Sequence, residues 1–135
     1  MKIEFKKIKQ NNPLLIAETA CGHNGDIKKL IKLINIAKNS GIKAIKFQIF
    51  KLDERSVPNS KEEKIFKNLT LSESEWKKAV NWAHKKKLFV FADIFGLDSL
   101  NLAEKIKVDG YKIHSEDALN HTFIEKVLSK NKITI

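Results

Sequence analysis

The stretch "LLIAETACGHNGD", Leu14 to Asp26, runs from a short apolar segment into an acid, Glu18, and then into a small, turn-prone sequence. The following "DIKKLIKLINIAKNSG" has apolar residues at the spacing of one helix face, with Asp26 as the N-cap and Gly41 as the stop. We therefore expect a buried strand within residues 13–19 and a helix over residues 26–41. This first pair of elements places Glu18 where the strand ends.

The same order of strand and helix repeats along the rest of the chain. The apolar patterns predict further strands at residues 43–50, 88–93, 110–115 and 132–135, and helices at residues 71–87, 97–107 and 120–131. Ser72 and Glu75 have the spacing of a capping box, and a polar connection containing Pro58 precedes them. Alternating strands and helices imply a parallel sheet with right-handed crossovers. Periodicity alone leaves open whether the sheet is doubly wound or closed into a barrel.

Composition bounds the class of protein. The formal net charge is +10, but Arg55 is the only arginine, and the lysines are spread through a background rich in Asn and Ile. Nucleic-acid readers rely on arginine and exposed aromatic side chains, so we expect no nucleic-acid partner and favour an anionic small substrate. The single cysteine, Cys21, excludes an internal disulfide. The apolar run from Leu14 to Ala17 is too short to cross a membrane, and we expect a cytoplasmic protein.

Polar residues gather where the predicted strands end. Both architectures place functional groups at the carboxyl ends of parallel strands. Lys46 and Lys112 are flanked by apolar residues, so burying them is costly unless an anion is close. The alternative interpretation is that each lysine reaches the solvent from a strand edge. The polar residues at these ends are Glu18, Lys46, Gln48, Asp93, Lys112, His114, Ser115 and Asp117.

Three motifs resemble a known family. In their order and spacing, "IAETACGHNGD", "KAIKFQ" and "YKIHSEDALN" are similar to the N-acetylneuraminate (sialic acid) synthase family, including its legionaminate, pseudaminate and spore-coat-polysaccharide relatives. The resemblance runs from about Pro13 to the last residue. It implies an α/β fold of the (β/α)8 TIM-barrel type. This chain, residues 1–135, would then be the N-terminal part of that barrel, truncated to about four βα units plus a fifth strand.

The resemblance also implies an activity. Such synthases condense phosphoenolpyruvate with the open-chain aldehyde of an N-acylated amino sugar, such as N-acetylmannosamine, to give a nine-carbon 2-keto sugar acid and phosphate. A divalent metal, Mn or Mg, is expected, but its histidine ligands would lie beyond this chain, so we assign no metal ligand here. By position, phosphoenolpyruvate would be bound by Lys46, Lys112 and Ser115. Gln48 would face the sugar, and Glu18 and Asp117 would be the catalytic acids.

Three histidines and Asp93 complete the set of residues considered for the site. We expect His23 and His114 to line the site, and His84 to be a solvated helix residue. Asp93 occupies a substrate-binding position where the family usually has Thr. An acid there repels phosphoenolpyruvate unless it pairs with a lysine or turns away.

Two other interpretations stay open. A (β/α)8 barrel needs about 250 residues, so this chain could be a half barrel without activity of its own that pairs with a second copy or with a complementing C-terminal half. A different phosphate-handling barrel enzyme, related to the 3-deoxy-keto-acid phosphate synthases, would explain the lysines. It would not explain the motifs "HNGD" and "KIHSED" together.

Overall fold

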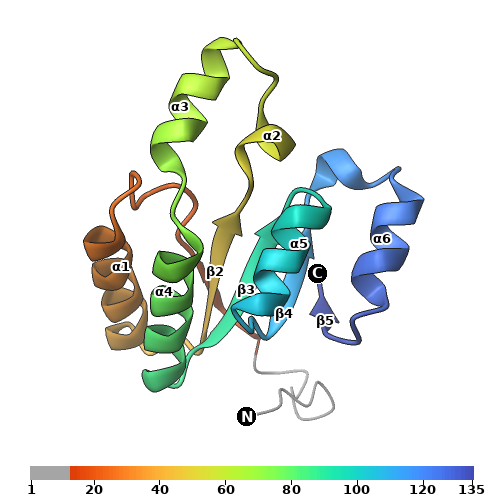
Figure 1. Cartoon of the computed structure of the whole chain (residues 1–135). Helices are drawn as coiled ribbons and strands as arrows, with labels where there is room; N and C mark the ends of the chain where they lie inside the picture. Colours follow the sequence, from red (N-terminus) through yellow and green to blue (C-terminus); the bar gives the residue numbers. More distant parts are fainter. Residues whose placement is uncertain (1–12) are drawn as a thin grey trace.

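The computed structural model describes residues 13–135, which form alternating strands and helices. The five strands are β1 (Ile16–Glu18), β2 (Ala44–Ile49), β3 (Phe89–Ile94), β4 (Gly110–Ile113) and β5 (Ile133–Thr134). The helices are α1 (Ile27–Asn39), α2 (Leu52–Arg55), α3 (Lys61–Leu69), α4 (Glu73–Lys85), α5 (Leu97–Lys105) and α6 (His121–Leu128). A short 3-10 helix, η2 (Ser115–Asp117), follows β4. The strands form one parallel sheet in the order β1-β2-β3-β4-β5 (Figure 1).

The helix ends form as their sequences predict. The Asp26 carboxylate accepts a hydrogen bond from the Lys28 backbone N–H at 2.7 Å and so caps α1. Gly41 follows this helix with a φ of +77°, a backbone conformation that glycine adopts without strain. At α4, the Ser72 hydroxyl accepts from the Glu75 N–H, and the Glu75 carboxylate accepts from the Ser72 N–H at 2.8 Å. Both N-caps and the stop at Gly41 are therefore confirmed.

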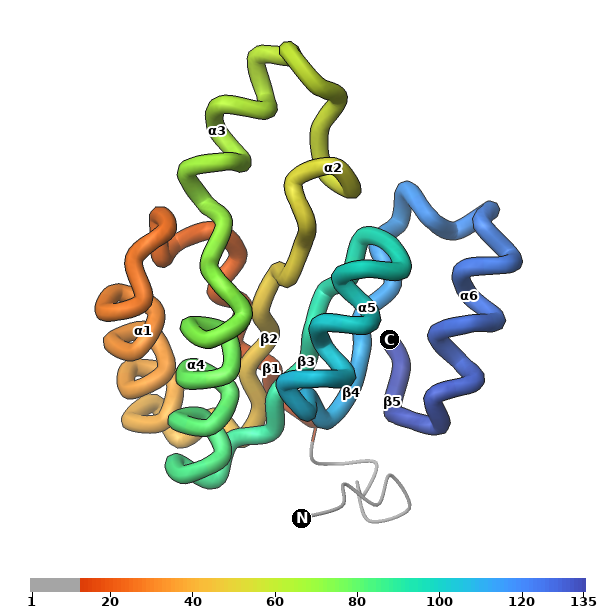
Figure 2. The backbone as a smooth tube through the Cα atoms, viewed as in Figure 1, coloured from red at the N-terminus to blue at the C-terminus, as the bar shows by residue number. Residues whose placement is uncertain are grey.

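The connection between β2 and α4 differs from the prediction. Residues 51–70 contain α2 and α3 in place of a polar loop, and Figure 2 shows both helices beyond the carboxyl ends of the strands. The Ser60 hydroxyl caps α3 by accepting from the Glu63 N–H at 3.1 Å. No residue of α3 is buried, and Ile65 is 59% exposed. The apolar residues of this short helix are Ile65, Phe66 and Leu69, and none is fully buried, so the segment was predicted to be part of a polar connection.

Helices α1, α4, α5 and α6 cover one face of the sheet. The core on this face includes Phe47, Val90 and Tyr111 from the strands. It is completed by residues of α1, α4, α5 and α6, among them Leu30, Ile34, Trp76, Val80, Leu100 and Phe123. A doubly wound sheet has helices on both faces, whereas a barrel has them only outside. Sequential strand order and one-sided cover therefore make this the barrel type of α/β fold.

The opposite face of the sheet carries the polar residues of the strands, because side chains alternate between faces. Gln48, Asp93 and Lys112 are register partners and form one row across β2, β3 and β4. Glu18 and Lys46 form the adjacent row on β1 and β2. Among residues 13–135, β1 pairs only with β2, and β5 pairs only with β4. None of the helices in this part of the chain is long and apolar enough to cross a membrane.

Candidate active site

Four charged side chains meet on the helix-free face, and we call them the ionic cluster: Glu18, Lys46, Asp93 and Lys112. The Lys46 ammonium contacts the Glu18 carboxylate and donates to Oδ2 of Asp93 at 3.1 Å. The Lys112 ammonium lies 3.7 Å from Oδ1 of the same aspartate. Strand register brings these groups together, since they come from four neighbouring strands, β1 to β4.

Burial and pairing together set the charge state of the cluster. The side chain of Lys46 is 15% exposed and that of Asp93 is 3% exposed, so Lys46 does not simply reach the solvent. Burial on its own lowers the pKa of Lys46, but the hydrogen bonds that its ammonium donates to Glu18 and Asp93 outweigh it, and the pKa is raised. Lys46 therefore stays protonated, and the two lysines are balanced by two carboxylates.

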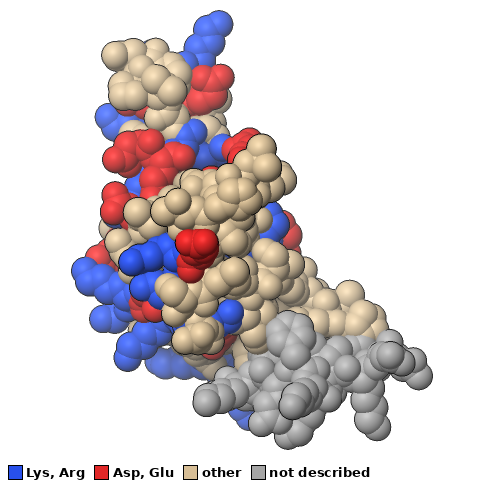
Figure 3. Space-filling model, turned by 90° about the vertical axis from the view of Figure 1, so that its right-hand side faces the viewer, with Lys and Arg blue, Asp and Glu red and all other residues tan. Residues whose placement is uncertain are grey.

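The excess of positive charge lies away from this cluster. On the face shown in Figure 3, lysine side chains gather over the lower, helical part of the molecule. Acidic side chains on that face lie mostly near the projecting α2–α3 segment. The ionic cluster, with two lysines and two carboxylates, adds nothing to the formal net charge of +10.

The turn after β1 brings the Cys21 thiol and the Ala20 backbone N–H to the cluster. The Cys21 thiol donates to Oε1 of Gln48 at 3.5 Å, and the Glu18 carboxylate accepts from the Ala20 backbone N–H at 2.9 Å. Ala20 has a φ of +43°, where glycine is favoured. Burial raises the pKa of the Cys21 thiol, the nearby Arg55 opposes this, and Glu18 adds to it. Cys21 is therefore a neutral hydrogen-bond donor.

Arg55 is a component of the site that the sequence interpretation missed. Its guanidinium lies 4.8 Å from the centre of the Phe66 ring and 5.0 Å from that of Phe95, and it pairs with Glu116 at 3.5 Å. His114 packs on Phe95 with ring centres 5.1 Å apart. The one signal available was that Arg55 is the only arginine in a lysine-rich chain. The rings of Phe66 and Phe95 thus hold the Arg55 guanidinium, a third cation, at the carboxyl ends of the strands.

Glu54 fixes α2 against the start of α5. Its carboxylate accepts from the backbone N–H of Asp98 at 2.7 Å and of Ser99 at 3.1 Å. The N-terminus of a helix favours such a negative charge. A Cβ atom on Gly96 would lie 2.3 Å from the Glu54 carboxylate, so a larger residue there would displace this side chain from its contact. Because Arg55 follows Glu54 in the sequence, the contact of Glu54 with α5 also fixes the backbone at Arg55.

Three predicted site residues lie apart from the ionic cluster. Ser115 and Asp117 are in η2, and no hydrogen bond or ion pair in the described part of the chain joins their side chains to the cluster. His23 is fully buried against Trp76, with ring centres 5.6 Å apart, and its Nδ1 accepts from the Gly25 N–H at 3.1 Å. Burial lowers the pKa of His23. His23 is therefore a buried core histidine, and its expected place lining the site stays a prediction.

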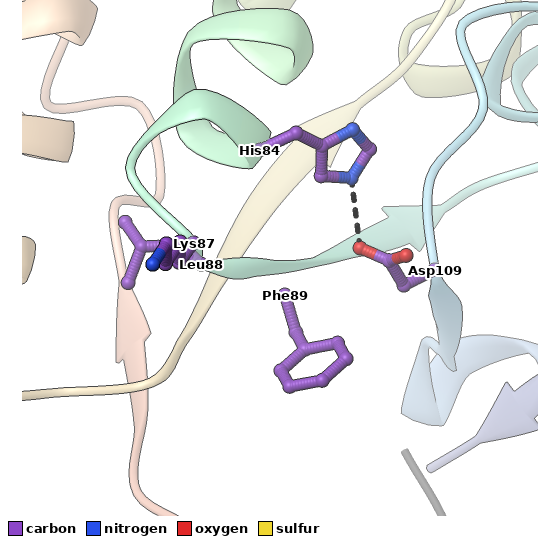
Figure 4. A pocket seen from close by; sticks show the side chains of 5 residues that line it. All are labelled: His84, Lys87, Leu88, Phe89 and Asp109. Atoms are coloured by element: carbon purple, nitrogen blue, oxygen red, sulfur yellow. Dashed lines mark hydrogen bonds and ion pairs between the residues drawn. The ribbon is translucent and has the colours of Figure 1, made fainter. Parts of the chain in front are cut away.

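A hollow of about 520 Å³ lies at the amino ends of β3 and β4, away from the ionic cluster (Figure 4). His84 from the end of α4 contacts Oδ2 of Asp109 at 2.9 Å, and the same oxygen accepts from the Val90 N–H at 2.8 Å. His84 is thus a partly exposed helix residue that also has a partner within the fold. Its contact with Asp109 links α4 to the beginnings of β3 and β4.

Known proteins are similar to this chain over most of its length. A family model described as the NeuB family matches residues 33–135. An uncharacterized protein of Methanocaldococcus jannaschii is 31% identical over 136 residues, covering 100% of this chain. N,N'-diacetyllegionaminic acid synthase of Campylobacter jejuni is 28% identical over 133 residues, covering 88% of this chain.

A solved structure with the same arrangement is the N-acetylneuraminic acid (sialic acid) synthetase from Leptospira borgpetersenii, crystallised with citrate. It superposes with a TM-score of 0.85 and is 30% identical, covering 92% of this chain and 44% of its own. The present chain spans 40% of the length of each of the two curated relatives named above.

Proposed function

The chain belongs to the NeuB family, and we propose that it contributes one part of an active site that condenses phosphoenolpyruvate with an N-acylated amino sugar. The enol carbon of phosphoenolpyruvate forms a bond to the aldehyde carbon of the open-chain sugar. Water then adds to the resulting cationic carbon, and the bond from that carbon to phosphate oxygen breaks. The products are a nine-carbon 2-keto sugar acid of the sialic or legionaminic type and inorganic phosphate.

The observation that carries this proposal is the convergence of Lys46, Gln48 and Lys112 on one sheet face. The lysines would bind the phosphate and carboxylate of phosphoenolpyruvate, since ammonium groups bind such anions strongly in a partly buried site. Asp93 balances both lysines in the absence of ligand, and an incoming anion would have to replace it. Gln48 would hydrogen-bond a sugar hydroxyl.

The proton-handling roles rest on the family resemblance. Glu18 lies against Lys46 at the mouth of the site, with its side chain 42% exposed, and would face the sugar. Asp117 and Ser115 would act only after η2 moves toward the cluster or the substrate bridges the gap.

The divalent metal expected of the family does not fit the residues described. No group of three or more His, Cys, Asp or Glu side chains within residues 13–135 is placed to hold a metal ion. We therefore derive no step through a metal and propose that any ligands come from outside this part of the barrel.

An alternative is a half barrel that needs a complementing partner, either a second copy or a separate C-terminal half. The single-sided pairing of β1 and β5 in residues 13–135 favours this arrangement, because an unpaired strand edge accepts another strand. In this case the ionic cluster would be only one wall of the site. The membership of the chain in the NeuB family favours both of these proposals over another phosphate-handling barrel enzyme, related to the 3-deoxy-keto-acid phosphate synthases.

Phosphate release tests these proposals. The full chain is assayed with phosphoenolpyruvate, N-acetylmannosamine and Mn²⁺, alone and with the remaining part of a related synthase supplied as a second chain. Turnover by the chain alone would refute the inactive half barrel. Turnover only with the second chain would support complementation.

A matched pair of variants separates chemistry from folding. We expect Lys46→Ala to abolish turnover, because it removes the central cation of the cluster. Lys64→Ala, which truncates an exposed lysine on α3, should leave turnover unchanged. Equal loss in both variants, or no turnover under either condition by correctly folded chains, would reject the synthase proposal.

A further inference from the structure

A shallow groove runs between α1 and α4 on the helical side of the molecule. Its volume is about 390 Å³. Ile27, Ile31 and Trp82 form its apolar floor, packing against the core while staying only partly buried. Ile27 and Ile31 are one helical turn apart, so the floor extends along the helix axis. The groove lies across the sheet from the ionic cluster, and nothing in the proposed synthase chemistry uses it.

Trp82 is held in a fixed orientation on this floor. Its indole N–H donates to Oδ1 of Asn35 on α1 at 3.0 Å, which ties the two helices together. The ammonium of Lys86 lies 4.8 Å from the ring centre. One edge of the indole is therefore occupied by hydrogen bonding, and a cation already lies over its ring.

The rims of the groove are formed by lysines from both helices: Lys28 and Lys32 on α1, and Lys78 on α4. Helix α1 contains four lysines and no acidic residue. The two acids of α4 are engaged, since Glu73 pairs with Lys105 at 2.8 Å and Glu75 caps the helix. Glu75 also interacts with Lys78, so the rim on α1 is the one without an acid within its own helix.

We propose that this groove is a docking surface for a short acidic amphipathic helix of a partner protein. Two large apolar side chains spaced one turn apart on such a helix would fill the floor over Ile27, Ile31 and Trp82. Acidic side chains flanking that apolar stripe would meet Lys28 and Lys32 on one rim and Lys78 on the other. The proposal combines apolar burial with complementary charge, the two features of a helix bound in a groove.

A nucleic acid fits this surface less well. Neither helix contains arginine, the residue that most often reads bases and stacks on them. Trp82 already has Lys86 over its ring and is tied at its edge to Asn35. An apolar floor also has no counterpart on a phosphate backbone. Phosphates would use the lysine rims and leave the floor empty.

The test measures binding of a fluorescently labelled peptide to the full chain by anisotropy. The peptide has about 14 residues, or about four helical turns, with leucines on one face and glutamates elsewhere. A peptide of the same composition with the leucines scattered is the control for the apolar floor. We expect saturable binding only of the amphipathic peptide, weakening as salt is raised to about 300 mM.

Charge reversal locates the binding surface. The groove variant carries Lys28→Glu, Lys32→Glu and Lys78→Glu, three exposed changes on the rims. We expect it to bind the amphipathic peptide about tenfold or more weakly than the unmodified chain. Circular dichroism and the thermal midpoint verify that this variant is folded.

A second variant changes the net charge equally and leaves the groove intact. It carries Lys61→Glu, Lys64→Glu and Lys67→Glu on α3, all exposed. It should bind within about twofold of the unmodified chain. Equal losses in the two variants, equal binding of the scattered peptide, or no saturable binding would overturn the proposal. Groove-dependent binding of a single-stranded oligonucleotide in place of the peptide would also overturn it. None of these outcomes depends on phosphate-release activity, so this test is independent of the proposed synthase function.

Discussion

Asp93 lies between Lys46 and Lys112, and its carboxylate is almost completely buried. A buried carboxylate between two ammonium groups takes the place, and has the sign of charge, of a bound phosphate. We therefore expect Asp93 to compete with an anionic ligand. By the family resemblance, Thr is expected at this point, so Asp93 would be an internal counter-ion in place of a neutral hydrogen-bond donor.

Replacing Asp93 by Asn should strengthen anion binding. The change removes the carboxylate that Lys46 and Lys112 share as a counter-ion, while Glu18 still pairs with Lys46. We expect the affinity for phosphoenolpyruvate and for inorganic phosphate, measured by calorimetry, to rise about fivefold, equivalent to about 1 kcal/mol. Asp98→Asn is the matched control, because it removes the same charge from the exposed start of α5. An unchanged or weaker affinity of folded Asp93→Asn would show that the lysines do not bind the anion.

At the scale of elements, α2 connects the projecting segment to the barrel. This four-residue helix has no buried residue, so packing contributes little to its stability. Glu54 instead supplies the acceptor for two backbone N–H groups at the start of α5. The neighbouring Arg55 lies between Phe66 of α3 and Phe95, which follows β3. Two adjacent residues thus join α2, α3 and α5.

Glu54→Ala should destabilise the protein by about 1–2 kcal/mol, because it leaves the first N–H groups of α5 without their acceptor. Chemical denaturation followed by circular dichroism measures this loss. Glu54→Gln, which keeps one acceptor oxygen but no charge, should fall between Ala and the unmodified chain. Glu62→Ala on exposed α3 should change the free energy of unfolding by less than about 0.5 kcal/mol. A loss no larger for Glu54→Ala than for this control would exclude the capping role.

At the scale of the whole molecule, Glu104 joins α5 to the last two strands. Its carboxylate accepts from the Tyr111 hydroxyl of β4 and pairs with Lys132, just before β5. Burial alone raises the pKa of Glu104, but the bonds from Lys132 and Tyr111 outweigh it, and the pKa is lowered from 4.5. Burial and Glu104 together raise the pKa of Tyr111 well above its usual range.

This pairing predicts an acid-sensitive stability. Because the pKa of Glu104 is lower in the folded state, its contribution is present above the unfolded pKa and is lost as the pH falls through the folded one. We expect the free energy of unfolding to fall less steeply for Glu104→Gln than for the unmodified chain below about pH 4.5. Glu125→Gln, on the exposed face of α6, should keep the original slope. Parallel curves for the unmodified chain and Glu104→Gln would contradict the linkage.

The sequence by itself determined the alternation of strands and helices, the N-caps Asp26 and Ser72, and the family motifs, because these signals are local. Helix α3, which is short and has no fully buried residue, was not predicted. Only the tertiary structure decided that the helices cover one face and that Asp93 pairs with Lys46, 47 positions away. It also decided that His23 is buried and that Arg55 joins the site. Contacts between strands depend on register and twist across the whole sheet, which no single segment encodes.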